Sequence, residues 1–178
     1  MEKVSGRVIV VSGLPGAGKS SVSRALAQRF ERGAHIEADT LQKMIVSGAS
    51  WPDPEITPES ERQLRLRVTH GCRLADSFAA AGFCAVLDDI FIGDRIDHLR
   101  ADLVTRPFHF VMLNPSLDAL RHRNATRDKR DVFHQSQQLH PVVQSKSQRI
   151  GLWLDTSGLS EAQTVERIYV SLSEAVVN

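Results

Sequence analysis

Cysteine is scarce in this sequence, which has only Cys72 and Cys84 among its 178 residues. The two do not form a Cys-x-x-Cys pair, and the sequence has no histidine pair at metal-binding spacing. These absences exclude a disulfide framework and a zinc site of the usual kind. We expect both cysteines to be reduced core thiols in a cytoplasmic protein.

Long apolar runs and a strong net charge are also lacking. No run approaches the roughly 18 residues of a membrane-spanning helix, and the apolar run after Lys3 and Arg7 is too short for a signal peptide. The formal net charge of +1 carries no electrostatic footprint of nucleic acid or membrane binding. We therefore expect no membrane partner, and the charge balance argues against nucleic acid. The length and the 42% apolar content fit one globular domain.

A glycine-rich motif near the N-terminus is the strongest feature that is present. It follows the short apolar run at residues 8–11, typical of a buried strand, and precedes residues 21–30, whose apolar positions repeat at helical spacing. This order identifies G-x-x-x-x-G-K-S as a P-loop, not the G-x-G-x-x-G of a dinucleotide-binding loop. Its N–H groups would bind phosphates, with Lys19 at the β- and γ-phosphates and Ser20 on Mg²⁺. The expected nucleotide-binding residues here are Gly13, Leu14, Pro15, Gly16, Ala17, Gly18, Lys19, Ser20 and Ser21.

Strand and helix patterns alternate through the rest of the chain. Further strands are predicted at residues 35–39, 83–87, 108–113 and 151–155. Helices are predicted at about residues 39–47, 59–81, 94–103, from 117 onward, 133–147 and 160–176. This alternation predicts a single-domain α/β fold, a five-stranded parallel sheet with helices on both faces.

Acidic residues end two of the predicted strands, and the carboxyl ends of parallel strands are where ligands collect. Asp88 and Asp89 follow the apolar strand, and an acid there in a P-loop protein holds Mg²⁺, usually through water. Asp88 is favoured because it directly ends the run, while Asp89 stays open as the alternative. Asp39 ends the strand at residues 35–39, so it could accept the proton of an attacking hydroxyl, and a capping role at the next helix is compatible.

Two further segments could complete a site. Arg123, Arg127 and Arg130 are spaced to share one helix face, and in a small lid at about residues 121–133 they would neutralise a transferred phosphate. A solvated, salt-bridged helix face is the simpler interpretation of the same charges. Residues 48–58 form a proline-punctuated loop, expected as a flap beside the substrate, in which Trp51 either packs or contacts the ligand.

These motifs together resemble the chloramphenicol phosphotransferase-like branch of the P-loop small-molecule kinases. The similarity rests on the P-loop, residues 36–41, the Asp-Asp-Ile-Phe-Ile-Gly stretch at 88–93, the arginines and residues 154–156, and it covers nearly the whole chain. The resemblance implies strand order 2-3-1-4-5, ATP and Mg²⁺ as cofactors, and γ-phosphate transfer to a hydroxyl. It implies that Asp39 is the base, that the three arginines hold phosphates, and that adenine lies near Thr156 and Ser157. We expect Asp39, Trp51, Asp89 and Phe91 to line the acceptor pocket.

The segment between Met44 and Glu61 departs from that family, because it is shorter and richer in proline. The acceptor therefore need not be chloramphenicol, since this segment sets the pocket. We expect a kinase that transfers phosphate from ATP to a hydroxyl group of a small molecule, for example an antibiotic. A nucleotide, a nucleotide sugar as for zeta-type toxins, and a polynucleotide 5′-hydroxyl stay open as acceptors. A nucleotide-dependent switch that transfers phosphate only to water is the alternative of another class, and the oligomeric state is left open.

Overall fold

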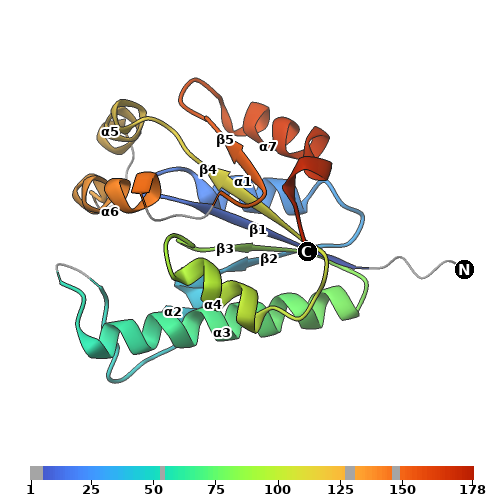
Figure 1. Cartoon of the computed structure of the whole chain (residues 1–178), viewed down its shortest axis with the longest axis horizontal. Coiled ribbons are helices and arrows are strands. Elements are labelled where there is room, and N and C mark those ends of the chain that lie inside the picture. Colours follow the sequence, from blue (N-terminus) through green and yellow to red (C-terminus); the bar gives the residue numbers. More distant parts are fainter. Residues whose placement is uncertain (1–5, 53–54, 127–130, 146–148) are drawn as a thin grey trace, which may run out of the picture.

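A single mixed sheet forms the centre of the protein, seen in a computed structural model that describes residues 6–52, 55–126, 131–145 and 149–178 (Figure 1). Five of its strands are parallel, in the order β2-β3-β1-β4-β5. This confirms the predicted α/β fold and strand order. The five strands are β1 (Arg7–Gly13), β2 (Gly33–Glu37), β3 (Cys84–Asp88), β4 (Phe108–Leu113) and β5 (Leu152–Leu154).

Helices cover both faces of this sheet. Figure 1 shows α1 (Lys19–Ala27) and α7 (Glu161–Val170) on one face. On the other face lie α2 (Ala38–Lys43), α3 (Pro58–Ala80) and α4 (Arg95–Asp102). Because neither face of the central strands meets water, β3 is buried along its whole length and residues 8–11 of β1 are fully buried.

Two more helices lie side by side beyond one end of the sheet. They are α5 (Leu117–Thr126) and α6 (Phe133–Ser145), which follow β4 in the chain (Figure 1). The P-loop and the carboxyl-terminal ends of β1 and β3 face the same end. The fold therefore brings segments from across the sequence to the place where parallel sheets bind ligands.

The C-terminus differs from the prediction of one helix to residue 176. The helix α7 ends at Val170, a short 3₁₀ helix (Leu172–Ala175) follows, and β6 (Val176–Val177) pairs antiparallel with β4. The strand β5 pairs only with the later part of β4. Without β6, the beginning of β4 would have no strand partner on the side facing away from β1. The helix expected at residues 39–47 is also shorter, ending at Lys43.

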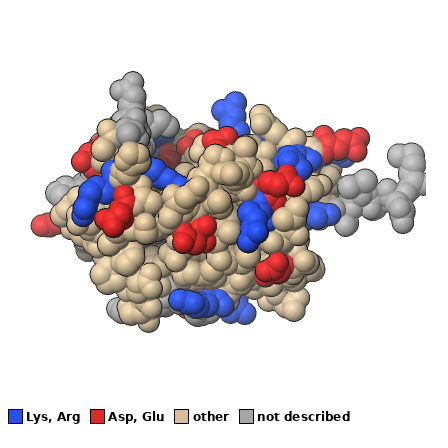
Figure 2. Space-filling view, turned by 90° about the horizontal axis from the view of Figure 1, so that it is seen from above, with Lys and Arg blue, Asp and Glu red and all other residues tan. Residues whose placement is uncertain are grey.

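The surface and the cysteines complete this description. Among the described residues, no helix is both long and apolar enough to cross a bilayer. Figure 2 shows basic and acidic side chains interspersed over one face of the molecule. Both cysteines are free and buried, and burial raises the pKa of each thiol to about 12.

Candidate active site

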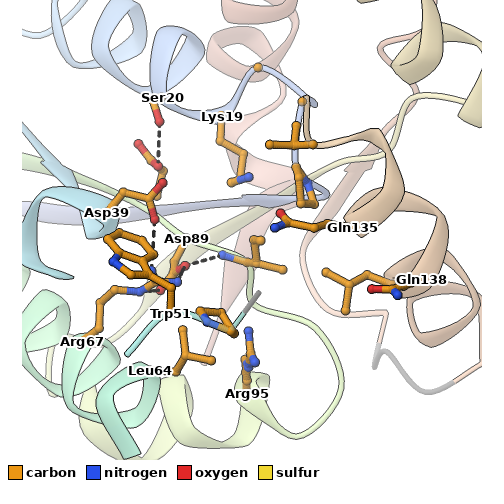
Figure 3. Close-up of a pocket in the computed structure, with 18 of the residues that line it drawn as sticks. Lys19, Ser20, Asp39, Trp51, Leu64, Arg67, Asp89, Arg95, Gln135 and Gln138 are labelled. Atoms are coloured by element: carbon orange, nitrogen blue, oxygen red, sulfur yellow. Dashed lines mark hydrogen bonds and ion pairs between the residues drawn. The ribbon is translucent and has the colours of Figure 1, made fainter. Parts of the chain in front are cut away.

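A cavity of about 670 Å³ opens at the carboxyl-terminal ends of β1 and β3 (Figure 3). Its walls come from the P-loop, the loop before α3, α3 itself, the segment after β3, and α5 and α6. It brings together most of the chemistry-bearing residues that the sequence predicts. The predicted site residues that line it are Pro15, Gly16, Gly18, Lys19, Ser20, Ser21, Asp39, Trp51, Asp88, Asp89 and Arg123.

The P-loop has the backbone needed to surround an anion. Gly16 and Gly18 have φ values of 79° and 92°, a left-handed conformation that glycine adopts without a steric penalty. Gly18 is also the N-cap of α1, so the loop leads directly into the helix N-terminus. Leu14 and Ala17 are buried, and the N–H of Ala17 donates to the carbonyl of Leu14 at 3.1 Å within the loop.

Lys19 is the first residue of α1, and its ammonium reaches back to the loop. Its Nζ donates to the carbonyl of Leu14 at 3.2 Å. Burial lowers the pKa of this ammonium below the ordinary value of 10.5, against the opposing effect of the carboxylates of Asp88, Asp89 and Asp39. Among the described residues this ammonium has only a carbonyl as its hydrogen-bond partner, and because Lys19 lines the cavity, a phosphate bound there would provide a stronger, anionic partner.

Ser20 and Asp88 form the pair expected at a magnesium site. The Ser20 hydroxyl donates to Oδ1 of Asp88 at 3.1 Å, although 68 positions separate them in the sequence. The other oxygen, Oδ2, lies 2.6 Å from Nε2 of His35 on β2. A hydroxyl and a carboxylate beside a phosphate-binding loop fit Mg²⁺, which takes few protein ligands and completes its shell with phosphate and water oxygens.

Asp89 has a different environment from its neighbour. Arg67 of α3 donates to both of its oxygens, from Nε at 3.0 Å and from Nη2 at 2.5 Å. Both side chains are almost completely buried, with 6% and 5% exposed. Asp89 Oδ1 also accepts from the N–H of Ile90. The structure thus separates the two acids, because Asp88 faces the P-loop serine and Asp89 is engaged by arginine.

Arg67 also reaches Asp39. Its Nη1 donates to Oδ1 of Asp39 at 3.0 Å, while the Asp39 side chain remains 61% exposed. Asp39 lies in the first turn of α2 and not at the end of β2, which stops at Glu37. It nevertheless lines the cavity, as an exposed carboxylate held in place by a buried arginine (Figure 3).

Trp51 is placed in the cavity wall by a buried glutamine. Gln63 of α3 accepts from the N–H of Ser50 at 2.8 Å and donates to the carbonyl of Gly48 at 2.8 Å. The loop before α3 is therefore fastened to the helix on one side of Trp51. Trp51 is 42% exposed and faces the same space as Asp39 (Figure 3).

Arg123 connects the P-loop to the segment after β5. Its guanidinium donates to the carbonyl of Ala17 at 3.4 Å and to the carbonyl of Thr156. Thr156 is buried, Ser157 bonds to Asp155 through its hydroxyl, and neither residue lines this cavity. The other two predicted lid residues, Arg127 and Arg130, lie outside the described residues.

Phe91 requires a correction. The sequence analysis expects it in the acceptor pocket, but its side chain is fully buried in the core and its neighbour Ile90 lines the cavity instead. The Ser12 hydroxyl donates to the carbonyl of Phe91 and accepts from its N–H, both at 3.0 Å. These two bonds fix the backbone at Phe91, whose side chain lies in the core and does not line the cavity.

Several lining residues were missed from the sequence. Arg67 follows Leu64 by one helical turn on the inward face of α3, so its place on an apolar stripe was a usable signal. Arg95, at the start of α4, and the α6 residues Gln135 and Gln138 had no such signal. The two glutamines lie on α6 beside Ser136, whose hydroxyl joins that helix to the P-loop by donating to the carbonyl of Pro15 at 2.7 Å.

The strand order, the P-loop after β1 and the acid at the end of β3 define a P-loop nucleotide-binding fold. The chain belongs to the AAA domain family, because the model of that family matches residues 8–147. The matched region runs from β1 through α6 and includes the P-loop, Asp39, Arg67 and both acids after β3.

Solved structures share this fold over nearly their whole length. An unliganded sugar kinase from Janibacter sp. HTCC2649 is 20% identical with a TM-score of 0.67, and the match covers 96% of each chain. A gluconokinase from Sinorhizobium meliloti 1021 is 22% identical with a TM-score of 0.66, covering 97% of this chain and 94% of that one. An APS kinase from Mycobacterium tuberculosis, in complex with AMPPNP and APS, is 16% identical with a TM-score of 0.67, covering 95% and 98%. A comparison with curated proteins gave no match.

Proposed function

We propose that this protein is an ATP- and Mg²⁺-dependent phosphotransferase that moves the γ-phosphate to a hydroxyl group of a small molecule. One observation carries the proposal: a single cavity holds the P-loop, the carboxylate of Asp39 and an apolar wall around Trp51. A site that only hydrolysed the nucleotide would not need this second, apolar region. Similarity in fold to a sugar kinase and a gluconokinase supports the same class.

Each residue has a role that its position supports. Lys19 and the loop N–H groups bind the phosphates, and Ser20 with Asp88 holds Mg²⁺. When bound, Mg²⁺ neutralises charge on the β- and γ-phosphates. Asp39 accepts the hydroxyl proton and aligns the oxygen, which bonds to the γ-phosphorus as the bond to the ADP oxygen breaks.

Positioning and charge neutralisation come from arginines. Arg67 keeps the exposed carboxylate of Asp39 in one orientation through the 3.0 Å ion pair. Arg123 lines the cavity next to the P-loop, and with Arg127 and Arg130 it would stabilise charge on the transferred group when a lid at residues 121–133 closes. The nucleotide base would then lie toward Thr156 and Ser157. Arg123 links this segment to the P-loop, because it donates to the carbonyl of Thr156.

The acceptor is a small molecule in this proposal. Chloramphenicol and other hydroxyl-bearing antibiotics are one class to test, because the sequence motifs resemble that phosphotransferase branch. Nucleotides, nucleotide sugars and polynucleotide ends are others. The mixed charge on the face in Figure 2 favours a small molecule over a polynucleotide, which needs a basic track.

The test is ADP release from ATP and Mg²⁺ by the purified protein, alone and with each class of acceptor. We expect strong stimulation by one class and a loss of about 10²- to 10⁴-fold in the Asp39→Asn variant. Asp118→Asn, at an exposed carboxylate of α5, is the matched control and should retain full activity. Slow turnover that no acceptor stimulates, and that Asp39→Asn leaves unchanged, would instead establish the nucleotide-dependent switch.

A further inference from the structure

One wall of the cavity is lined mainly by apolar side chains. They come from the loop before α3, from α3 and from the segment after β3. Such a wall gains free energy by contact with an apolar or aromatic body, and it offers few partners to a molecule covered with hydroxyls. These residues are Trp51, Pro52, Ile56, Leu64 and Ile90.

The cations that line the same cavity are not equivalent. Lys19 and Arg123 bond to carbonyls of the P-loop, so they belong to the phosphate end. Arg67 is already neutralised, because three of its nitrogens donate to the carboxylates of Asp39 and Asp89. Among the described lining residues, this leaves Arg95 as the cation that could serve the acceptor.

Among the described residues, Glu61 is the one acidic partner of the Arg95 side chain, and the contact is long. Nη2 of Arg95 lies 3.7 Å from Oε2 of Glu61, which is an ion pair but is longer than a hydrogen bond. The Arg95 side chain is 19% exposed and Glu61 is 49% exposed. A ligand carboxylate could therefore replace Glu61 and form the shorter, two-pronged contact that a guanidinium prefers.

The position of Arg95 suits a group remote from the reacting hydroxyl. Figure 3 shows Arg95 apart from Asp39, with Leu64 and Trp51 labelled between them in this view. The carboxylates of Asp39, Asp88 and Asp89 would repel a second anion at the reacting end. One arginine, in apolar surroundings, matches a singly charged carboxylate better than a doubly charged phosphate.

We infer that the acceptor is a small hydroxy acid with an apolar body, whose carboxylate is bound by Arg95 while its hydroxyl lies at Asp39. The inference rests on the proposed phosphotransferase function and names the substrate class of that site. Arg95 here is a specificity residue, because it binds a part of the substrate that does not react.

Matched pairs of acceptors test this directly. The first pair is 3-phenyllactate and its methyl ester, which share an apolar body and differ in the carboxylate charge. The second pair is gluconate and sorbitol, which have polar bodies and also differ in that charge. We expect the wild-type protein to prefer 3-phenyllactate over its ester by about 10- to 100-fold in kcat/KM, as for a hydrogen bond to a charged group. We expect it also to prefer 3-phenyllactate over gluconate.

Variants then locate the source of the preference. Arg95→Gln should raise KM for the acid and abolish the acid preference with little change in kcat, and Arg95→Lys should restore part of it. Glu61→Gln should lower KM for the acid, since it removes the competing carboxylate. Arg100→Gln, at an exposed arginine of the same helix, is the matched control and should behave as wild type. Thermal melting checks that each variant is folded.

The outcomes separate this inference from the proposed function. Equal turnover of acid and ester, or an acid preference that survives in Arg95→Gln, would overturn the role of Arg95 while phosphate transfer stands. Preference for gluconate over 3-phenyllactate would overturn the inference that the acceptor has an apolar body. A protein that binds ATP but releases no ADP with any acceptor, charged or neutral, would overturn the proposed function and this inference together.

Discussion

Arg67 and Asp89 form a two-pronged ion pair in the interior, with Nε to Oδ2 at 3.0 Å and Nη2 to Oδ1 at 2.5 Å. The pair joins the middle of α3 to the end of β3, beside the candidate site. Arg67 thereby couples the stability of the fold to the position of Asp39, which it also contacts.

Removing one member of this pair should be costly. We predict that Arg67→Met lowers the free energy of unfolding by about 3–5 kcal/mol, because Asp89 would remain buried without its partner. Chemical denaturation measures this change. The double variant Arg67→Met, Asp89→Leu should recover most of the loss, and a double variant no more stable than the single one would contradict this explanation.

The two neighbouring acids should differ in metal dependence. We predict that Asp88→Asn weakens Mg²⁺-dependent binding of an ATP analogue by about 10- to 100-fold, since Asp88 bonds to Ser20 of the P-loop. Asp89→Asn should affect stability more than metal affinity, because Asp89 is engaged by Arg67. Calorimetric titration with and without Mg²⁺ compares the two, and the reverse ranking would assign the metal to Asp89.

The lowered pKa of Lys19 predicts proton uptake on nucleotide binding. Burial lowers this pKa from 10.5, so in alkaline solution below that value part of the free protein has an uncharged Lys19. A bound triphosphate favours the ammonium and raises the pKa, so ATP affinity should fall as the pH rises through the lowered pKa. Calorimetry in buffers of different ionisation enthalpy measures the protons taken up.

Lys19→Arg provides the comparison for this measurement. A guanidinium stays charged throughout the range, so the variant should take up no proton at this position. Equal proton uptake by the variant and the wild type would assign the effect to another group.

Nucleotide binding should also slow hydrogen exchange in α5 and α6. Arg123 of α5 and Ser136 of α6 already bond to carbonyls of the P-loop, so a ligand that orders the loop should order both helices. The C-terminal half of α3 serves as the reference segment. If ATP and Mg²⁺ leave the exchange rates of α5 and α6 unchanged, lid closure is not part of the mechanism.

Local sequence predicted the five parallel strands and the P-loop, whereas the strand order came from the family resemblance and β6 was not predicted. The strand β4 has the bounds predicted from its apolar run, and β3 ends at the predicted acid, because strands buried on both faces must be apolar along their length. The P-loop was equally clear, since the left-handed backbone at Gly16 and Gly18 favours glycine and the motif also has the lysine expected to bind phosphate.

The acceptor side of the site was decided by the tertiary structure. Phe91 and Ile90 are adjacent and both apolar, so their pattern does not tell which one lines the cavity; in the fold Phe91 is buried, with its backbone bonded to Ser12 of β1, and Ile90 lines the cavity. The sequence favoured Asp88 over Asp89 but left both open, and they differ in the fold because Ser20 contacts Asp88 and Arg67 contacts Asp89. Local patterns fix local conformation, whereas the partner of a buried charge depends on which distant segments the fold brings into contact.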